Sequence, residues 1–165
     1  MPINFFEAQC SSFSKDKLIG ICDDPPPANN PAYLDLQNRN NWISIVKNIQ
    51  EKEFSFHAID NCIEVLKPDG TLDSRCDGLL KVNKDLIFIE LKNRVSSGWL
   101  SKGRSQLTNT INVFRRTHNP NDFDSIKAYV SNKQRPYSNT IHFGEIQRFR
   151  NDTSLILRVQ QEIEI

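Results

Sequence analysis

Apolar residues recur along the chain at spacings that predict two helices. A first helix is predicted over residues 40–52, because four apolar side chains fall on one face at helical spacing. These four residues are Trp42, Ile45, Val46 and Ile49. A second helix is expected from residue 97 or 98 to about residue 116, with a narrow apolar stripe formed by Leu100, Leu107, Ile111 and Phe114.

Shorter apolar or alternating runs predict strands between these helices and after them. The expected strands cover residues 54–59, 74–82, 85–93, 125–131 and 155–159. Residues 86–89, Leu-Ile-Phe-Ile, are typical of a central strand that is buried on both faces. Asn83 and Lys84 predict a tight hairpin before that strand, although lysine is disfavoured where a positive φ is needed.

The order helix, three strands, helix, strand indicates an α/β fold. We expect a mixed central β-sheet flanked by helices (αβββαβ), with a core over about residues 40–131. Residues 1–37 and 132–165 are then additions to one single domain over residues 1–165. Within them, residues 17–22 are a candidate strand, residues 23–31 a proline-rich loop and residues 144–150 a candidate short helix.

Composition narrows the class of protein. The chain has 165 residues, of which 38% are hydrophobic and 25% charged, as in ordinary globular domains. No apolar run could cross a bilayer, and residues 1–10 do not read as a secretory signal, so we expect a cytoplasmic protein. The four cysteines (Cys10, Cys22, Cys62 and Cys76) form no C-x-x-C pair and have no histidine at zinc-ligand spacing. We therefore expect reduced thiols rather than zinc or a disulfide.

Positive charge is concentrated in one stretch of the chain. Residues 81–116 contain eight basic and two acidic residues, which gives +6, whereas the whole chain has a net charge of +1. The remaining residues therefore carry −5. A basic zone of this kind is a candidate binding surface for DNA or RNA. The simpler alternative is that these cations lie on a solvent-exposed helix face and bind no partner.

The predicted hairpin brings acidic residues from two strands together. If Val82 faces Asp85, the constant index sum of an antiparallel pair places Asp77 opposite Glu90. Two carboxylates this close repel each other unless a proton or cation intervenes, and hard cations such as Mg²⁺ prefer oxygen ligands.

The residues after Glu90 extend this candidate site. Lys92 points to the same side of the strand as Glu90, whereas Leu91 points toward a core but offers its backbone carbonyl as a metal ligand. Such a patch can hold a metal and position a water for attack on a phosphodiester. The alternatives are a surface ion pair, or a register slip of one residue that moves Asp77 to the other face.

The spacing of these residues resembles a known motif. Arg75-Cys76-Asp77-Gly78, followed after Ile89 by Glu90-Leu91-Lys92, is similar to the PD-(D/E)XK nuclease motif, with Cys76 in place of its proline. The order of elements over residues 40–131 also resembles the restriction-endonuclease-like core.

The resemblance implies a chemistry and a substrate class. In such enzymes the equivalents of Asp77 and Glu90 bind Mg²⁺, which Mn²⁺ can replace, and the equivalent of Lys92 serves the attacking water. It implies a DNA endonuclease of restriction, junction-resolving or repair type, although RNA remains an alternative substrate. The products would carry a 5′-phosphate and a 3′-hydroxyl. A homodimer is a candidate oligomeric state. The alternatives are an inactive nucleic-acid-binding protein of the same fold and an unrelated α/β protein with a chance motif.

Further candidates lie outside the motif. Gln106 resembles the helix glutamine of exonuclease members of this superfamily, but Thr110 stands where an aromatic residue often follows, and an exposed amide is the alternative. Glu53 or Glu64 is a candidate third carboxylate. Trp99 could pack in the core or stack on a base. His57 is expected to be a half-buried strand residue. The candidate phosphate contacts are Arg94, Lys102, Arg104, Arg115 and Arg116.

Overall fold

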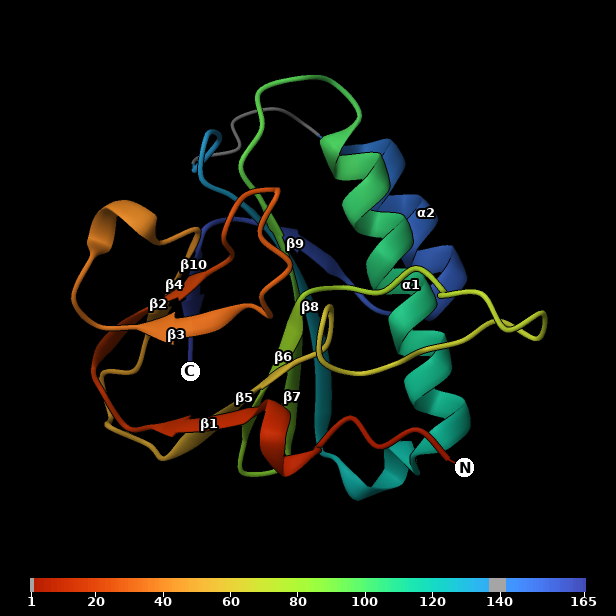
Figure 1. Ribbon diagram of the computed structural model, residues 1–165, viewed down its shortest axis with the longest axis horizontal. Helices are drawn as coiled ribbons and strands as arrows, with labels where there is room; N and C mark the ends of the chain where they lie inside the picture. Colours follow the sequence, from red (N-terminus) through yellow and green to blue (C-terminus); the bar gives the residue numbers. More distant parts are fainter. Residues whose placement is uncertain (1, 137–141) are drawn as a thin grey trace.

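The computed structural model describes residues 2–136 and 142–165. Two β-sheets face each other, and two α-helices cover the outer face of the larger sheet (Figure 1). The α/β class and the mixed sheet are thus as predicted. The helices lie on one face only, however, and the smaller sheet covers the other face, so the expected flanking by helices is wrong for that side.

The larger sheet has six strands in the order β1-β5-β6-β7-β8-β9. The strands are β1 (Ser11–Ser14), β5 (Phe54–Ala58), β6 (Gly78–Val82), β7 (Asp85–Lys92), β8 (Ser125–Asn132) and β9 (Leu157–Val159). Neighbours from β1 to β7 pair antiparallel, whereas β7-β8 and β8-β9 are parallel. A parallel pair needs a crossover, which helix α1 (Trp99–Thr117) provides between β7 and β8.

The smaller sheet is built from the two ends of the chain. Its order is β10-β4-β2-β3, with strands β2 (Leu18–Cys22), β3 (Tyr33–Asp35), β4 (Ser44–Lys47) and β10 (Glu162–Glu164). Helix α2 (Phe143–Thr153) packs beside α1 on the opposite side of the molecule. Three short 3₁₀-helices are η1 (Ala8–Cys10), η2 (Arg39–Asn41) and η3 (Pro120–Asp122).

Strand β7 separates two apolar cores. Leu86 and Phe88 point into the core beneath α1, and Ile87 and Ile89 point into the core between the sheets. This arrangement explains the continuous apolar run, because a strand buried on both faces has no polar side. The predicted hairpin before β7 is confirmed. Of its two turn residues only Asn83 adopts a positive φ, of 53°, so Lys84 does not need this disfavoured conformation.

The predicted helix over residues 40–52 is wrong, because this segment forms η2 and then β4. Buried residues alternate there, and two of them, Ser44 and Asn48, are polar. Each is satisfied by hydrogen bonds: Ser44 Oγ donates to the Gln161 carbonyl, and the Asn48 amide bonds to Lys52. Ile49, expected on the apolar face, is 75% exposed. Burial alternates from residue to residue, as in a strand, but the sequence does not show this alternation because two of the buried residues are polar.

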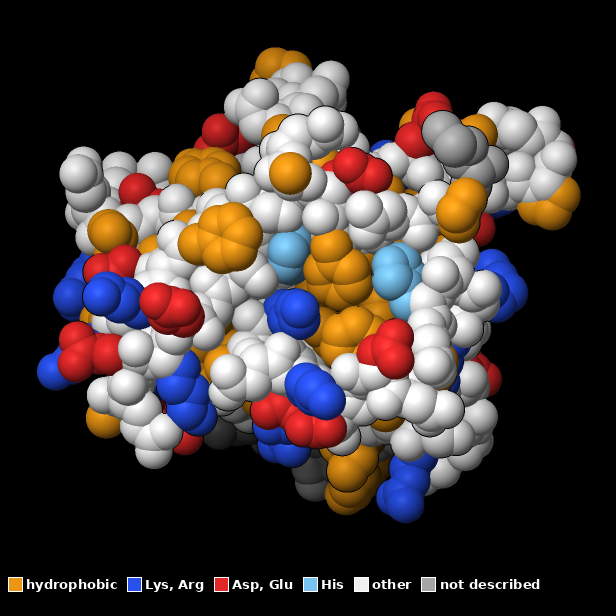
Figure 2. All heavy atoms as spheres, turned by 90° about the horizontal axis from the view of Figure 1, so that it is seen from below, with side chains coloured by type: hydrophobic (Ala, Val, Ile, Leu, Met, Phe, Trp, Pro, Cys, Tyr) orange, Lys and Arg blue, Asp and Glu red, His pale blue; other side chains and the backbone are white. Residues whose placement is uncertain are grey.

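The N-terminal segment packs against the core between the larger sheet and α1. Phe5 is fully buried against Phe114, and the Phe6 ring contacts the rings of His57 and His118. Figure 2, a view from below, shows apolar side chains between two histidines on this face. The segment is therefore an integral part of the core beneath α1.

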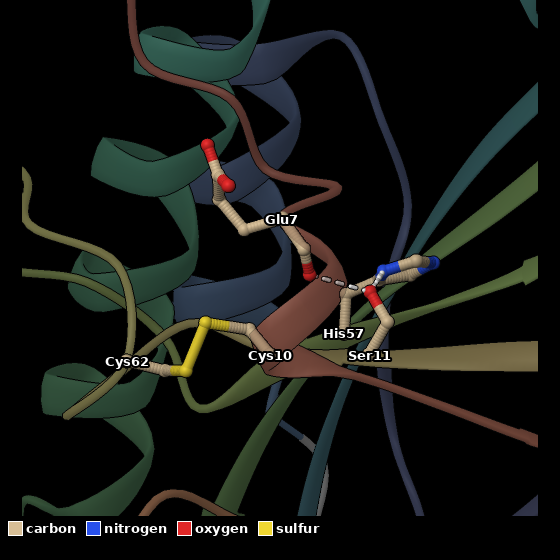
Figure 3. Close-up of a disulfide and its surroundings, with 5 residues drawn as sticks. All are labelled: Glu7, Cys10, Ser11, His57 and Cys62. Carbon is tan, nitrogen blue, oxygen red and sulfur yellow. Dashed lines mark hydrogen bonds between the residues drawn. A yellow bond between two sulfur atoms is a disulfide. The ribbon is translucent and has the colours of Figure 1, made fainter.

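A disulfide joins Cys10 to Cys62 across 52 positions of sequence (Figure 3). The expectation that all four cysteines are reduced is therefore wrong, although Cys22 and Cys76 are free and buried as predicted. The pairing depends on how the N-terminal segment folds back, which no local pattern indicates. Within the described residues, no helix is long and apolar enough to span a membrane.

Candidate active site

The β6–β7 hairpin has the predicted register. Its pairs run from Val82 with Asp85 to Gly78 with Ile89, so that the next step along the same register brings Asp77 opposite Glu90. Asp77 lies in a bend immediately before β6. Gly78 is required at the start of this strand, because a Cβ there would lie 2.5 Å from Cζ of Phe56.

The three motif side chains are buried at one end of the hairpin. The exposed fractions are 7% for Asp77, 2% for Glu90 and 9% for Lys92. Glu90 and Lys92 share the α1 side of β7 with Phe88, and Leu91 packs into the core between the sheets. The predicted division between the two faces is thus confirmed.

Hydrogen bonds connect the motif residues to one another and to α1. The Leu91 N–H donates to Asp77 Oδ2 at 2.6 Å. The Lys92 ammonium lies 2.7 Å from Glu90 Oε1 and donates to Gln106 Oε1 at 2.8 Å. Because the N–H and C=O of one strand residue face the same side, the Leu91 carbonyl also leaves the strand on the Asp77 side.

One carboxylate oxygen at this site has no partner. Glu90 Oε2 is fully buried and, within the described part of the chain, accepts no hydrogen bond. A buried unsatisfied acceptor is unfavourable by about 1–3 kcal/mol, and by more when it is charged. The proton of a neutral Asp77 would supply the missing partner, and a cation bound between the two acids would replace that proton, so the chemistry of these donors fits a divalent metal.

The electrostatics of the pair support the same reading. Burial raises the pKa of Asp77 well above its ordinary value, and the charge of Glu90 raises it further, against the Leu91 hydrogen bond. Burial also raises the pKa of Glu90 to about 7, against the lowering effects of Lys92 and of a side-chain hydrogen bond with Asp77. Full ionisation of both groups near neutral pH thus requires additional positive charge nearby.

The metal would need ligands besides side chains. Among residues 2–136 and 142–165, no three His, Cys, Asp or Glu side chains are grouped closely enough to hold an ion. Mg²⁺ commonly keeps several waters and takes only one or two carboxylates from a protein. Asp77, Glu90 and the Leu91 carbonyl are compatible with that coordination.

Helix α1 positions the site through residues that the sequence left uncertain or missed. Gln106 lies in the site, where its amide Nε2 donates to the Arg75 carbonyl at 3.2 Å. Thr110 Oγ1 accepts from the Cys76 N–H at 2.7 Å and donates to the Gln106 carbonyl at 2.8 Å. Gln106 and Thr110 are four residues apart, which places them on one face of the helix, and this spacing could have indicated from the sequence that both face the motif. Gly103 allows close approach, since a Cβ there would lie 3.3 Å from Cγ of Glu90.

Two acidic residues from outside the motif lie within electrostatic range. Burial raises the pKa of Asp23 to about 6, the charge of Asp60 raises it further, and Lys92 lowers it. Asp60 forms an ion pair with Arg75 at 2.9 Å. Asp23 follows β2 of the smaller sheet, so only the tertiary fold brings it to this site. The earlier candidates Glu53 and Glu64 are both exposed, and Glu53 lines a pocket with Asn83 at the turn end of the hairpin.

The candidate phosphate contacts fall into two groups. Arg94 and Lys102 are exposed and lie near the motif. Arg104 is instead buried in an ion pair with Glu145 at 2.5 Å, and Arg115 donates to the Thr153 carbonyl at 2.6 Å, so both bind α2. Arg116 is exposed in the last turn of α1. It lies roughly 20 Å along the helix from Lys102.

Pockets flank the motif on both sides of Lys102. One, of about 230 Å³, is lined by Asp60, Arg75 and Gln106 among others. The second, of about 140 Å³, is lined by Lys92, Arg94 and the start of α1. A larger pocket, about 480 Å³, lies around Phe13 and Asn83, away from these groups. Asp77 and Glu90 line neither of the two smaller pockets, which adjoin the motif through Gln106 and Lys92.

His57 has the structural role expected of it, although it is buried rather than half-buried. Its Nδ1 is 2.7 Å from Ser11 Oγ, which in turn donates to the Glu7 carbonyl (Figure 3). Its Nε2 is 2.8 Å from Ser55 Oγ. Burial lowers the pKa of His57 to about 4, so the ring is neutral at physiological pH.

Comparisons with known proteins identify no relative: no family model matches the chain, and no curated protein or solved structure matches it significantly.

Proposed function

We propose that this chain is a metal-dependent nuclease of the PD-(D/E)XK type, in which Asp77 and Glu90 hold a divalent cation. The observation that carries the proposal is the unpartnered, buried Oε2 of Glu90 beside Asp77, at the point where Lys92 and Gln106 also meet. A surface ion pair would leave no carboxylate oxygen buried without a partner.

The order of elements supports a restriction-endonuclease-like core over β5, β6, β7, α1 and β8. These elements supply the βββαβ part of the expected αβββαβ order. The first helix is replaced by strand β4, so any acidic group that a first helix would supply must come from elsewhere.

Mg²⁺ is the proposed cofactor, with Mn²⁺ as its substitute. The ligands would be the carboxylates of Asp77 and Glu90 and the carbonyl of Leu91. A bound Mg²⁺ would polarise the phosphodiester and lower the pKa of a coordinated water.

The protein groups around this site have separate tasks in the proposed reaction. The Leu91 N–H fixes one oxygen of Asp77, and Glu90 Oε1 and Gln106 Oε1 hold the Lys92 ammonium in place. Lys92 then donates a hydrogen bond to the attacking water and offsets negative charge that develops on the phosphate. The bond from the water oxygen to phosphorus would form as the bond from phosphorus to the 3′ oxygen breaks, the water would lose a proton to solvent and the leaving 3′ oxygen would gain one. The ends would then be a 5′-phosphate and a 3′-hydroxyl, as the resemblance implies.

DNA is the proposed substrate and internal cleavage the proposed mode. The exposed cations Arg94 and Lys102 beside the motif suit a phosphate backbone of either DNA or RNA. The choice of DNA rests on the resemblance alone, and the assay therefore includes RNA.

Cleavage assays on plasmid, linear and branched DNA and on RNA, with Mg²⁺ or Mn²⁺, test this proposal. Asp77→Asn, Glu90→Gln and Lys92→Met should each lower the rate by at least about a hundredfold. The matched controls Glu64→Gln and Lys84→Ala alter exposed charges, the second at the other end of the same hairpin, and should cut like wild type. Equal residual cutting by the motif variants and wild type would contradict the proposal.

Nucleic-acid binding without cutting by wild type would favour the alternative, an inactive binding protein of the same fold. Gel filtration or sedimentation of the same wild-type protein, with and without DNA, would test the candidate homodimer. A dimer that forms only on DNA would indicate paired cutting of the two strands.

A further inference from the structure

The pocket between the end of β7 and the start of α1 is lined by positive charge. Lys92, Arg94 and Lys102 line it together with Ser96 and Trp99, and no carboxylate is among its lining residues. By contrast, the pocket on the other side of Lys102 includes Asp60 and Asp73. The two sides of the candidate site therefore differ in charge.

Two of the three cations of this pocket, Arg94 and Lys102, are not neutralised locally. Within residues 2–136 and 142–165, neither Arg94 nor Lys102 forms an ion pair, although both are exposed. Lys92 is nine-tenths buried, and its ammonium bonds to Glu90 and Gln106, so it links the pocket to the motif. An anion in the pocket would then lie next to the proposed reaction centre.

The backbone adds donors to the same pocket. Helix α1 begins after Gly98, which has a φ of +87° and offers no side chain to cap the free N–H groups. The first turn contains no acidic residue. Free N–H groups at a helix start favour an anion, and here they supplement three cationic side chains.

We propose that this pocket binds the phosphate adjacent to the one that is cut, on the same nucleic-acid strand. The inference rests on the proposed function, because it assigns a neighbouring phosphate to a site beside the motif. Its volume of about 140 Å³ makes it the smaller of the two pockets beside Lys102. The pocket that contains Asp60 has two acids and two cations among its lining residues and so attracts a phosphate less, which gives the bound strand a direction across the motif.

Trp99 lines the pocket and provides a built-in reporter. The other tryptophan, Trp42, lies between η2 and β4 and is 4% exposed, and its Nε1 donates a hydrogen bond to Asp35. Titration with pyrophosphate in EDTA should therefore change the fluorescence of wild type but not of Trp99→Phe. Arg94→Ala and Lys102→Ala should weaken pyrophosphate binding about tenfold, since each removes a charge-assisted contact. Lys84→Ala, which removes an exposed charge at the turn end of the hairpin, should have no effect.

A second measurement uses the salt dependence of DNA binding. With Ca²⁺ in place of Mg²⁺ to suppress cutting, log Kd of a short duplex is measured against log salt concentration. Arg94→Ala and Lys102→Ala should each lower the slope by about 0.9, the value for one lost phosphate contact, and Lys84→Ala should leave it unchanged.

Failure of the inference and failure of the proposed function give different results. If DNA is cut but Arg94→Ala and Lys102→Ala bind pyrophosphate and DNA like Lys84→Ala, the phosphate site is wrong and the nuclease stands. If pyrophosphate binds with the expected pattern but no nucleic acid is cut, the anion site stands without the nuclease. An absent Trp99 response to pyrophosphate overturns the inference.

Discussion

Glu90 links the site to the stability of the metal-free protein. Its folded pKa of about 7 lies above its ordinary value of 4.5, so between these pH values the folded protein holds the proton that the unfolded chain releases. The contribution of Glu90 to the free energy of unfolding therefore falls as pH rises from 4.5 to 7, and its full penalty is present above pH 7.

Substitution of Glu90 should reveal this penalty. Glu90→Gln in EDTA should raise the free energy of unfolding at pH 8 by up to about 3 kcal/mol and should add nothing at pH 4.5. Urea denaturation at the two pH values measures the difference, with Glu64→Gln as control. A gain of equal size at both pH values would show that the charge of Glu90 is not its cause.

His57 has the opposite pH dependence. Burial lowers its pKa from 6.5 to about 4, so the unfolded chain binds more protons than the folded protein between these values. Its contribution to stability is complete above pH 6.5 and is lost as pH falls toward 4. His57→Gln should remove up to about 2 kcal/mol of that acid sensitivity, as measured by denaturation at pH 5 and pH 7. Unchanged acid sensitivity would contradict the role of this ring.

At the scale of elements, α1 holds the hairpin in position through a threonine. Thr110 is 1% exposed and accepts the Cys76 N–H, immediately before Asp77. Thr110→Val keeps the shape but leaves that N–H without a partner, which should reduce stability by about 1–3 kcal/mol and also slow cutting. Thr108 bonds only to the carbonyl of its own helix, at Arg104, so Thr108→Val is the matched control. Equal effects of the two substitutions would contradict a role of the hydrogen bond between Thr110 and the Cys76 N–H.

The elements differ in how far the sequence predicted them. Strand β7 and its hairpin followed from the apolar run and from Asn83, since both signals are local. The segment that contains β4 was misread, because Ser44 and Asn48 are polar residues that lie inside the fold. Gln106 could be proposed from its place on the helix, whereas the approach of Asp23 to the motif depends on packing between two sheets.

At the scale of the whole molecule, the Cys10–Cys62 disulfide ties the N-terminal segment to the loop after β5. It closes a loop of 52 residues, which corresponds to about 4 kcal/mol of stabilisation in the chain-entropy account. Reduction by dithiothreitol should therefore lower the melting temperature by about 10 °C. The double variant Cys10→Ser, Cys62→Ser should melt at that lower temperature with or without the reductant, since the other two cysteines are unpaired. A wild-type melting temperature that dithiothreitol leaves unchanged would contradict this role.

The central proposal concerns the whole site: Asp77 and Glu90 would hold one divalent cation, whose charge would offset the effect of burial that raises the pKa values of both acids. Titration with Mn²⁺, followed by electron paramagnetic resonance, tests this claim without the need for a substrate. Wild type should bind Mn²⁺ at pH 8 and more weakly below pH 7, because both acids must lose their protons. Glu90→Gln should bind at least about tenfold more weakly than wild type and Glu64→Gln. Equal Mn²⁺ affinity in all three proteins, or affinity that does not change with pH, would contradict the account.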